Sequence, residues 1–245
     1  MDDLWLRIFH RAPQRPIRLV CLPHAGGSAS SLFGFSAAVG SVAEVVAVQY
    51  PGRQDRWRDR PMTNLGDLAD QVADAVLAGL TGPVALFGHS MGSAVAFEVA
   101  LRLERVGRAP VRLVASGGRA PSLARSDGIH DLDDEGLVNE LVRLGGTDPR
   151  LLENREMVEM MLPAIRADYT AIEAYRAPED AKVACPITTL VGDDDPRTSL
   201  DQARAWDRHT SGEFDLRVYP GGHFYLFDHV PQLAEEISKM LEGDL

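Results

Sequence analysis

The 245-residue sequence has few cysteines, fewer basic than acidic side chains and no long apolar run. Its two cysteines, Cys21 and Cys185, lie in apolar segments, where a thiol usually packs as a small hydrophobic side chain. We therefore expect both thiols to be free. The 36 acidic side chains against 25 lysines and arginines give a formal net charge of -11, which opposes binding to a phosphate backbone. Nucleic acid is not expected as a partner.

Long apolar segments are also missing. No stretch approaches the ~18 consecutive apolar residues that a membrane-spanning helix needs. The amino terminus, MDDLWLRIFHRAPQRP, opens with two acids and lacks the apolar core of a signal peptide. Hydrophobic residues make up 45% of the chain and charged residues 25%, which is typical of a globular domain. We expect residues 1–245 to form one cytoplasmic domain with no membrane partner.

Short runs rich in valine, isoleucine and leucine recur along the chain and are nearly continuous rather than alternating. Such runs are typical of strands buried on both faces of a parallel sheet. They predict strands at 17–22, 45–48, 83–87, 111–115, 187–191 and 216–219. Helical patterns lie between them, one with apolar residues four apart from Leu68 to Leu80 and another from Ala94 to Leu103. Alternating strands and helices predict an α/β fold with a doubly wound sheet.

One connection is much longer than the others. The predicted strands at 111–115 and 187–191 are separated by about 70 residues, whereas a single crossover needs only about a dozen. Apolar positions at 137–142 predict one amphipathic helix, and those from Met157 to Tyr175 predict one or two more, with Pro163 starting or kinking one. These helices could pack on the body as extra core, or form a lid at about 125–180 whose methionines face an acyl chain.

The segment Gly88-His89-Ser90-Met91-Gly92 joins a predicted strand to a predicted helix. The pattern G-x-S-x-G in this context is typical of a nucleophile elbow, in which small residues permit a very tight turn. The turn would hold the Ser90 hydroxyl at a helix amino terminus, where backbone N–H groups favour developing negative charge. A glycine-rich loop without chemistry would explain the pentapeptide alone, but the flanking strand and helix favour the catalytic interpretation.

A nucleophilic serine needs a histidine as base and an acid that orients it. His223 follows the last predicted strand in YPGGHF, where its loop could reach Ser90. Asp193, Asp194 and Asp195 all follow the preceding strand directly. The first could hold the loop through backbone amides, and the third precedes a proline that favours extended backbone. The residues alone leave the choice of acid open.

The oxyanion that forms on attack needs two hydrogen-bond donors. The N–H of Met91, next to the nucleophile, is one candidate, and the second is expected from the loop after an early strand. That loop reads LPHAGGS from Leu22 to Ser28, and its glycines let a ligand approach the backbone closely. The N–H of Ala25 is the candidate there.

Five segments together resemble the type II thioesterases that serve polyketide and nonribosomal peptide synthases: PHAGGSAS, QYPGRQDR, FGHSMGS, GDDDP and GGHFYL. The resemblance runs in order from about Leu19 to the carboxyl terminus. It implies an α/β-hydrolase fold, with a mostly parallel central sheet, helices on both faces and a helical lid in the long connection. It also implies a triad of Ser90, Asp195 and His223, with oxyanion-hole amides at Ala25 and Met91.

The same resemblance implies a substrate and partners. The substrate would be an acyl thioester on the phosphopantetheine arm of an acyl or peptidyl carrier domain, and the reaction would remove stalled or aberrant acyl groups. Small acyl thioesters would also react. No metal or dissociable cofactor is expected, since the arm belongs to the substrate. Candidate substrate-binding residues are His24, Arg53, Met160, Met161 and Tyr169.

Four arginines gather in RQDRWRDR, at 53–60. They could pair with their own neighbours Asp55 and Asp59, as most surface clusters do, or contact the phosphate of the arm or an acidic face of a carrier domain. Three other functions stay open from the sequence. They are a general carboxylesterase, an acyltransferase of the same fold, and a catalytically silent module that only binds carrier domains.

Overall fold

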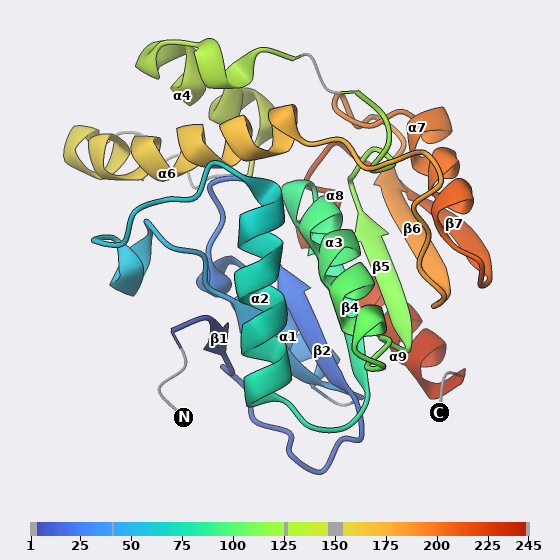
Figure 1. Ribbon diagram of the computed structural model, residues 1–245. Helices are drawn as coiled ribbons and strands as arrows, with labels where there is room; N and C mark the ends of the chain where they lie inside the picture. The colour runs from blue at the N-terminus through green and yellow to red at the C-terminus, as the bar shows by residue number, and fades with distance from the viewer. Residues whose placement is uncertain (1–3, 41, 125–126, 147–153, 244–245) are drawn as a thin grey trace.

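The computed structural model describes residues 4–40, 42–124, 127–146 and 154–243 (Figure 1). Within these residues, seven strands form one sheet in the order β1-β3-β2-β4-β5-β6-β7. The strands are β1 (Leu6–Arg7), β2 (Arg18–Leu22), β3 (Glu44–Val48), β4 (Val84–His89), β5 (Arg112–Ser116), β6 (Ile187–Gly192) and β7 (Phe214–Tyr219). β1 is antiparallel to β3, and all other neighbouring strands are parallel. The six predicted strands are confirmed. β1, with two residues, is too short to show a pattern.

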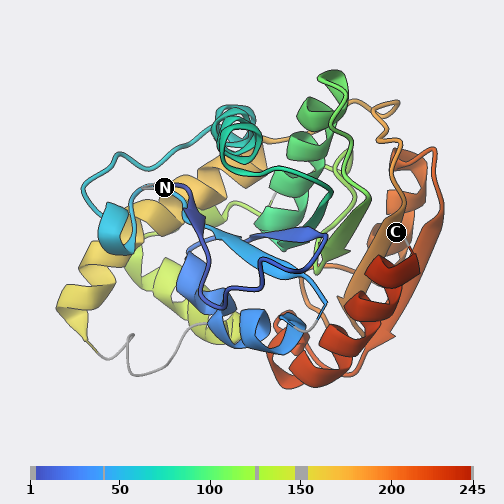
Figure 2. The ribbon, with the colours of Figure 1, turned by 90° about the horizontal axis from the view of Figure 1, so that it is seen from below.

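Helices cover both faces of the sheet. α2 (Leu65–Gly79) and α3 (Met91–Arg105) pack on one face, and α1 (Phe33–Val39) and α9 (Val230–Gly243) pack on the other. Figure 2 shows the sheet between these two pairs of helices. The remaining helices are α4 (Asp134–Leu144), α6 (Arg155–Ala174), α7 (Leu200–Arg204) and α8 (Tyr225–Asp228). The architecture agrees with the predicted doubly wound α/β fold.

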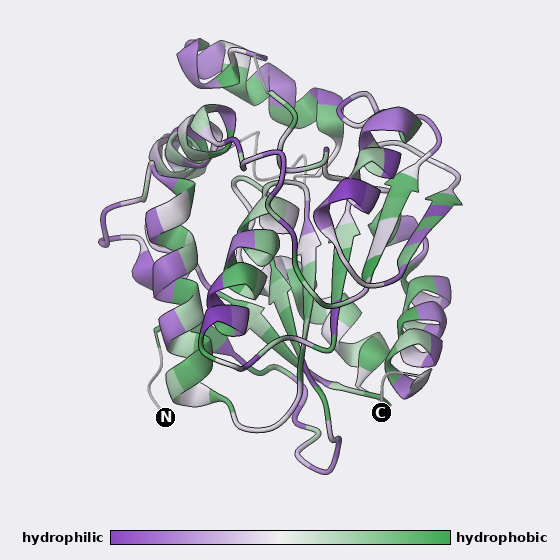
Figure 3. Cartoon of the chain, turned by 45° about the vertical axis from the view of Figure 1, so that its right-hand side comes forward, coloured by the Kyte–Doolittle hydropathy of each residue, from purple (hydrophilic) through white to green (hydrophobic). Residues whose placement is uncertain are grey.

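Successive residues of each central strand bury opposite faces. In β2, Val20 and Leu22 belong to the cluster under α2 and α3, whereas Leu19 and Cys21 belong to the cluster under α1 and α9. All four are fully buried. This double burial explains the nearly continuous apolar runs of the central strands, because both faces of these strands are covered by helices. Figure 3 shows the resulting apolar interior and the polar outer faces of the helices.

Cys21 and Cys185 are buried and are not joined by a disulfide, as expected. Burial raises the pKa of the Cys21 thiol, because the thiolate would lose its hydration. Among the described residues, no helix combines the length and the apolar character needed to cross a bilayer.

The connection between β5 and β6 is helical where it is described. Asp133 caps α4 by accepting from the N–H of Gly136 at 2.8 Å, and Gly145 ends the helix with a φ of 77°. α6 is one helix of 20 residues with Pro163 inside it, so the proline does not start a separate helix. Parts of the predicted lid, at 125–126 and 147–153, lie outside the described residues.

α4 and α6 lie beyond the carboxyl edge of the parallel strands, at the upper left of Figure 1 and above α2. Residues of both helices form a separate apolar cluster, which includes Leu137, Leu141, Leu162 and Ile165. The carboxyl-terminal part of α6 instead joins the main core through Ala171 and Ile172. One end of α6 is thus fixed to the body of the protein, and its other part packs with α4.

The core predicts a large loss of stability for Phe97→Ala. Phe97 is fully buried on α3, with its ring centroid 5.8 Å from that of Trp206 and 5.5 Å from that of His209. Removing the ring leaves a cavity, so we expect the free energy of unfolding to fall by about 3–5 kcal/mol. Urea denaturation measures it. Val106→Ala, at a position 58% exposed after the same helix, is the matched control. Equal losses in the two variants would contradict the assignment of Phe97 to the core.

Candidate active site

Ser90 lies in the turn between β4 and α3 with φ 56° and ψ -118°, a backbone conformation that residues with a side chain rarely adopt. The N–H of Ser90 donates to the carbonyl of Ser116 at 2.8 Å, which ties the turn to the end of β5. The hydroxyl is therefore held at the carboxyl edge of the sheet, at the amino terminus of α3. This is the strand, turn and helix arrangement that the sequence pattern predicts.

Steric contacts explain why the pentapeptide has glycine at its first and last positions. A Cβ placed on Gly88 would lie 2.1 Å from the carbonyl oxygen of Gly92, and one placed on Gly92 would lie 2.1 Å from the carbonyl oxygen of Leu22. Both obstacles are backbone atoms, which cannot rotate away as a side chain can. The turn therefore depends on the absence of side chains at these two positions.

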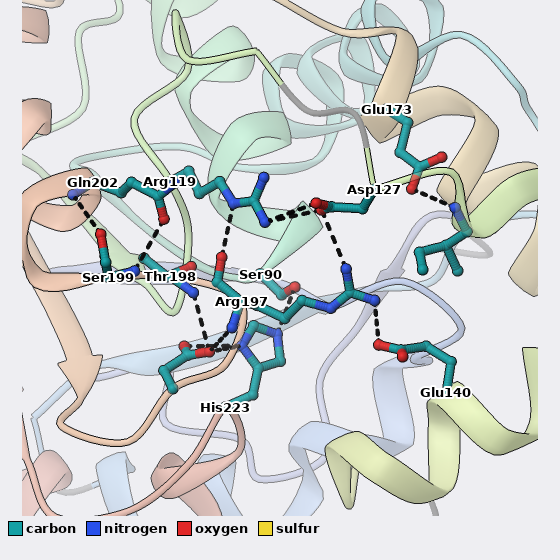
Figure 4. Close-up of polar contacts among 12 residues, drawn as sticks. Ser90, Arg119, Asp127, Glu140, Glu173, Arg197, Thr198, Ser199, Gln202 and His223 are labelled. Carbon is teal, nitrogen blue, oxygen red and sulfur yellow. Dashed lines mark hydrogen bonds and ion pairs between the residues drawn. The ribbon is translucent and has the colours of Figure 1, made fainter.

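Ser90, His223 and Asp195 form a continuous chain of hydrogen-bond contacts. The Oγ of Ser90 lies 2.9 Å from Nε2 of His223, and the Nδ1 of His223 lies 3.0 and 2.9 Å from the two carboxylate oxygens of Asp195. Asp195 follows β6 and His223 follows β7, the neighbouring strand. The Asp195 side chain is fully buried and that of His223 is 3% exposed. The structure thus places the three predicted residues together, as Figure 4 shows for Ser90 and His223.

The three consecutive aspartates have different surroundings. Asp193 is exposed, and its carboxylate accepts from the N–H of Gly221 at 2.9 Å, so it holds the neighbouring loop, as the sequence suggests. Asp194 is exposed and its side chain makes none of the hydrogen bonds found among the described residues. Asp195 alone contacts His223.

His24 and His89 are adjacent to the site but are held neutral. Burial, followed by the nearby charges of His223 and Arg53, lowers the pKa of His24 to about 3. Burial is also the main reason that the pKa of His89 lies well below its usual value. The Nδ1 of His89 lies 2.9 Å from Oγ of Ser116, and its ring centroid lies 5.1 Å from that of His223. These neutral rings surround His223 without adding positive charge beside it.

Ala25 and Met91 line a small cavity together with Ser90 and His223. This cavity has a volume of about 50 Å³. Ala25 comes from the loop after β2, and Met91 is the first residue of α3, where backbone N–H groups are free of intrahelical bonds. β2 and β4 are adjacent strands, and the connections that follow them lead to opposite sides of the sheet. The two loops therefore lie next to each other at the carboxyl edge, where α/β proteins commonly bind ligands.

A larger cavity has a volume of about 500 Å³. It shares His24 and Gly146 with a small pocket that Ser90 lines. Met160 and Met161 line the large cavity, and Tyr169 lines the pockets at the serine. Three methionines and Trp57 make much of its wall apolar; the other residues that line it are mostly glycines and serines.

Arg53 also lines the large cavity, but its guanidinium is already paired. Its Nη1 and Nη2 lie 2.7 and 2.9 Å from the two carboxylate oxygens of Asp168, and both side chains are buried. The sequence-based alternatives for the arginine cluster named neither this partner nor this burial. Asp168 lies 115 residues further along the chain, on α6, so no local pattern could have indicated the pair. Its carboxylate also accepts from the N–H of Gly26 at 2.8 Å, which holds the loop after β2.

The other members of the arginine cluster are paired partly as expected. Arg56 pairs with Asp59 at 2.8 Å, which is the local pairing that the sequence offered as one alternative. Asp55 instead pairs with Arg7, at 2.6 Å. Arg58 stacks over the exposed ring of Trp57, with 4.8 Å from its guanidinium carbon to the ring centroid.

The sheet, the serine turn and the loops that surround it define an α/β-hydrolase, as the sequence motifs imply. A family model described as "Thioesterase domain" matches residues 17–241. The chain belongs to this thioesterase family. The resemblance to type II thioesterases is therefore confirmed.

Three known proteins are similar to this chain over nearly its whole length. A "Probable cadicidin biosynthesis thioesterase" of Streptomyces griseus is 48% identical over 98% of this chain, which spans 66% of that relative's length. "Thioesterase PikA5" of Streptomyces venezuelae is also 48% identical, over 98% of this chain and 86% of that protein. The solved structure of "the type II thioesterase BorB from the borrelidin biosynthetic cluster" is 44% identical and superimposes with a TM-score of 0.91, covering 98% of each chain.

The buried pair of Arg53 and Asp168 leads to a stability prediction. Asp168→Ala leaves a buried guanidinium without its partner, so we expect the free energy of unfolding to fall by about 3–5 kcal/mol. Chemical denaturation measures the change. Glu159→Ala removes the partner of Arg155 in an exposed pair on the same helix, and we expect its stability to match that of the wild type. If Asp168→Ala proved as stable as Glu159→Ala, the buried pair would make no contribution to the free energy of unfolding.

Proposed function

We propose that this thioesterase removes acyl groups from the phosphopantetheine arm of acyl or peptidyl carrier domains, as an editing enzyme of polyketide or nonribosomal peptide biosynthesis. The observation that carries this proposal is the contact chain from Ser90 through His223 to Asp195 at a strained turn. The relatives' names, which include cadicidin biosynthesis and the borrelidin cluster, support the biosynthetic setting. A cytoplasmic location, where soluble carrier domains would be available, is part of the proposal.

The proposed reaction begins with the attack of the Ser90 hydroxyl on the thioester carbonyl. His223 accepts the hydroxyl proton on Nε2, while Asp195 holds the imidazole through Nδ1 and stabilises its positive charge. The N–H groups of Ala25 and Met91 donate to the oxyanion. His223 then returns the proton to the departing thiol, which leaves readily because its pKa is ~8.5.

Water completes the proposed cycle. His223 accepts a proton from a water molecule, whose oxygen attacks the acyl group on Ser90. Collapse of the second tetrahedral intermediate breaks the bond to Ser90 and releases the carboxylic acid, and His223 returns the proton to the serine oxygen. Each step uses side chains and backbone groups of this chain, and the phosphopantetheine arm enters as part of the substrate.

The acyl chain is assigned to the large cavity beside His24. Its wall carries Met160 and Met161, and unbranched methionine side chains adapt to apolar chains of different shape. Among the described residues that line it, Arg53 is the one ordinarily charged side chain, and Asp168 neutralises it. His24 lines both this cavity and the small pocket at Ser90, and Tyr169 lines that small pocket. We include in the proposal that α4 and α6 form a lid on a single domain, because their residues line these cavities.

Ser90→Ala provides the first test. An acyl carrier domain loaded with a propionyl group is incubated with wild type or variant, and intact mass records the loss of the acyl group. We expect the wild type to remove it and the variant to be slower by at least a thousandfold, because the nucleophile is absent. The matched propionyl oxygen ester is assayed in parallel.

Each outcome of that test is informative. Retention of the acyl mass with the wild type would contradict the proposed editing reaction. Faster cleavage of the oxygen ester than of the thioester would favour a general carboxylesterase. Appearance of the acyl group on an added alcohol or amine, rather than as free acid, would favour an acyltransferase.

The cavity assignment predicts a change in chain-length preference for Met160→Asp. A carboxylate in the apolar wall disfavours a long alkyl chain but not a short one, so we expect the ratio of kcat/KM for octanoyl over propionyl thioesters to fall about tenfold. Met160 is 51% exposed, so the variant is expected to fold. Val142→Asp, at an exposed apolar position of α4 outside the cavity, is the matched control. An unchanged ratio in Met160→Asp would place the acyl chain elsewhere.

A further inference from the structure

The loop that carries Asp195 is held by its own backbone and by the segment that follows β5. Oδ1 of Asp195 accepts from the N–H of Arg197 at 2.8 Å and from that of Thr198 at 3.2 Å, in addition to its contact with His223. The hydroxyl of Thr198 donates to the carbonyl of Gly117 at 3.1 Å. The orientation of the carboxylate therefore depends on where the backbone at 197 and 198 lies.

The side chain of Arg197 extends from this loop to two other segments (Figure 4). Its Nη1 lies 3.2 Å from a carboxylate oxygen of Asp127, and its Nη2 pairs with Glu140 of α4. Arg119, from the segment after β5, donates from Nε to the carbonyl of Arg197 at 2.7 Å and pairs with Asp127 at 2.9 Å. Arg197 thus links the Asp195 loop to α4 through one guanidinium.

This link is not an ordinary surface ion pair. The side chains of Arg197 and Glu140 are 13% and 9% exposed, so water screens their attraction only weakly. Burial alone would raise the pKa of Glu140, but hydrogen bonds from Arg143 and Arg197 and the charge of Arg197 hold it below its usual value. Glu140 is therefore ionised at neutral pH and can hold both arginines.

α4 also forms part of the wall around the serine. Leu141 and Leu144 line the small pocket that Ser90 and His223 line. Arg197 lines the neighbouring cavity, which contains the same serine and histidine. The residue that anchors α4 therefore lies beside the reacting groups, and the helix that it anchors closes the pocket.

We propose that Arg197 is a positioning residue that couples the placement of α4 over Ser90 to the alignment of Asp195 on His223. With Arg197 paired to Glu140, the loop at 195–198 is fixed to α4, and the carboxylate faces Nδ1 of the histidine. When α4 moves away, that pair is lost, and the loop keeps only its contacts to Asp127 and to the body. This coupling rests on the proposed hydrolysis, in which Asp195 orients His223.

A double-mutant cycle tests the coupling. Arg197→Gln, Glu140→Gln and the double variant are assayed for hydrolysis of propionyl-N-acetylcysteamine, with kcat normalised to the folded fraction by circular dichroism. We expect each single variant to lower kcat about tenfold with KM nearly unchanged, because catalytic geometry is disturbed and substrate contacts are not. The double variant should be no slower than the single ones, since both changes break the same link.

Arg143→Gln is the matched control, because Arg143 pairs with the same Glu140 through two contacts of 2.8 Å but does not touch the Asp195 loop. We expect it to lower the melting temperature while leaving kcat within twofold. Unchanged kcat in Arg197→Gln and Glu140→Gln, with lowered melting temperatures, would overturn the coupling and leave a purely structural role. Effects that multiply in the double variant would also overturn it.

Two further results separate the possible failures. A wild type that does not hydrolyse the thioester would contradict the proposed function itself, whereas an active wild type with equally active variants would contradict only the coupling. If Arg197→Gln does not fold, Glu140→Gln decides the matter, because it removes the negative charge that attracts Arg197 to α4 and leaves the pair of Arg197 with Asp127.

Discussion

The site depends on the contact between two glycine backbones and their neighbours around Ser90. Gly88 and Gly92 approach other backbone atoms so closely that a methyl group on either would overlap them. This packing forces Ser90 to a φ of 56° and places its hydroxyl above the carboxyl edge of the sheet. The strain at one residue is balanced by the fully buried core on both faces of β4, which holds the turn in place. The loops that bring His223 and Asp195 are placed by the same sheet.

Around this turn, polar interactions connect segments that are far apart in the sequence. Asp168 of α6 holds both Arg53 and the loop that carries Ala25, and Glu140 of α4 holds Arg197 beside Asp195. Both helices of the long connection are therefore attached by buried ion pairs to loops that line the site. Ion pairs of this kind have strict geometric requirements and favour one arrangement of the parts. The positions of α4 and α6 are therefore determined by these ion pairs at the site as well as by apolar packing.

The local patterns were sufficient for much of the fold. Six strands follow from apolar runs, and α2 and α3 follow from apolar periodicity, because burial on a sheet or on one face of a helix produces a regular pattern of apolar residues. The strand β1, with only two residues, has no such pattern. α6 passes through Pro163 as one helix, since packing on α4 and on the core outweighs the loss of one helical hydrogen bond.

The sequence alone determined the serine turn, the candidate base and the family, because these depend on residues that are close together or on motifs in a fixed order. Among Asp193, Asp194 and Asp195 the residues left a choice, and only the folded chain brings the third to His223. The partners of Arg53 and Arg197 were likewise decided by tertiary structure. Each pairs with an acid that lies 57 or more residues away in the sequence. A contact over such a separation cannot be predicted from a local sequence pattern.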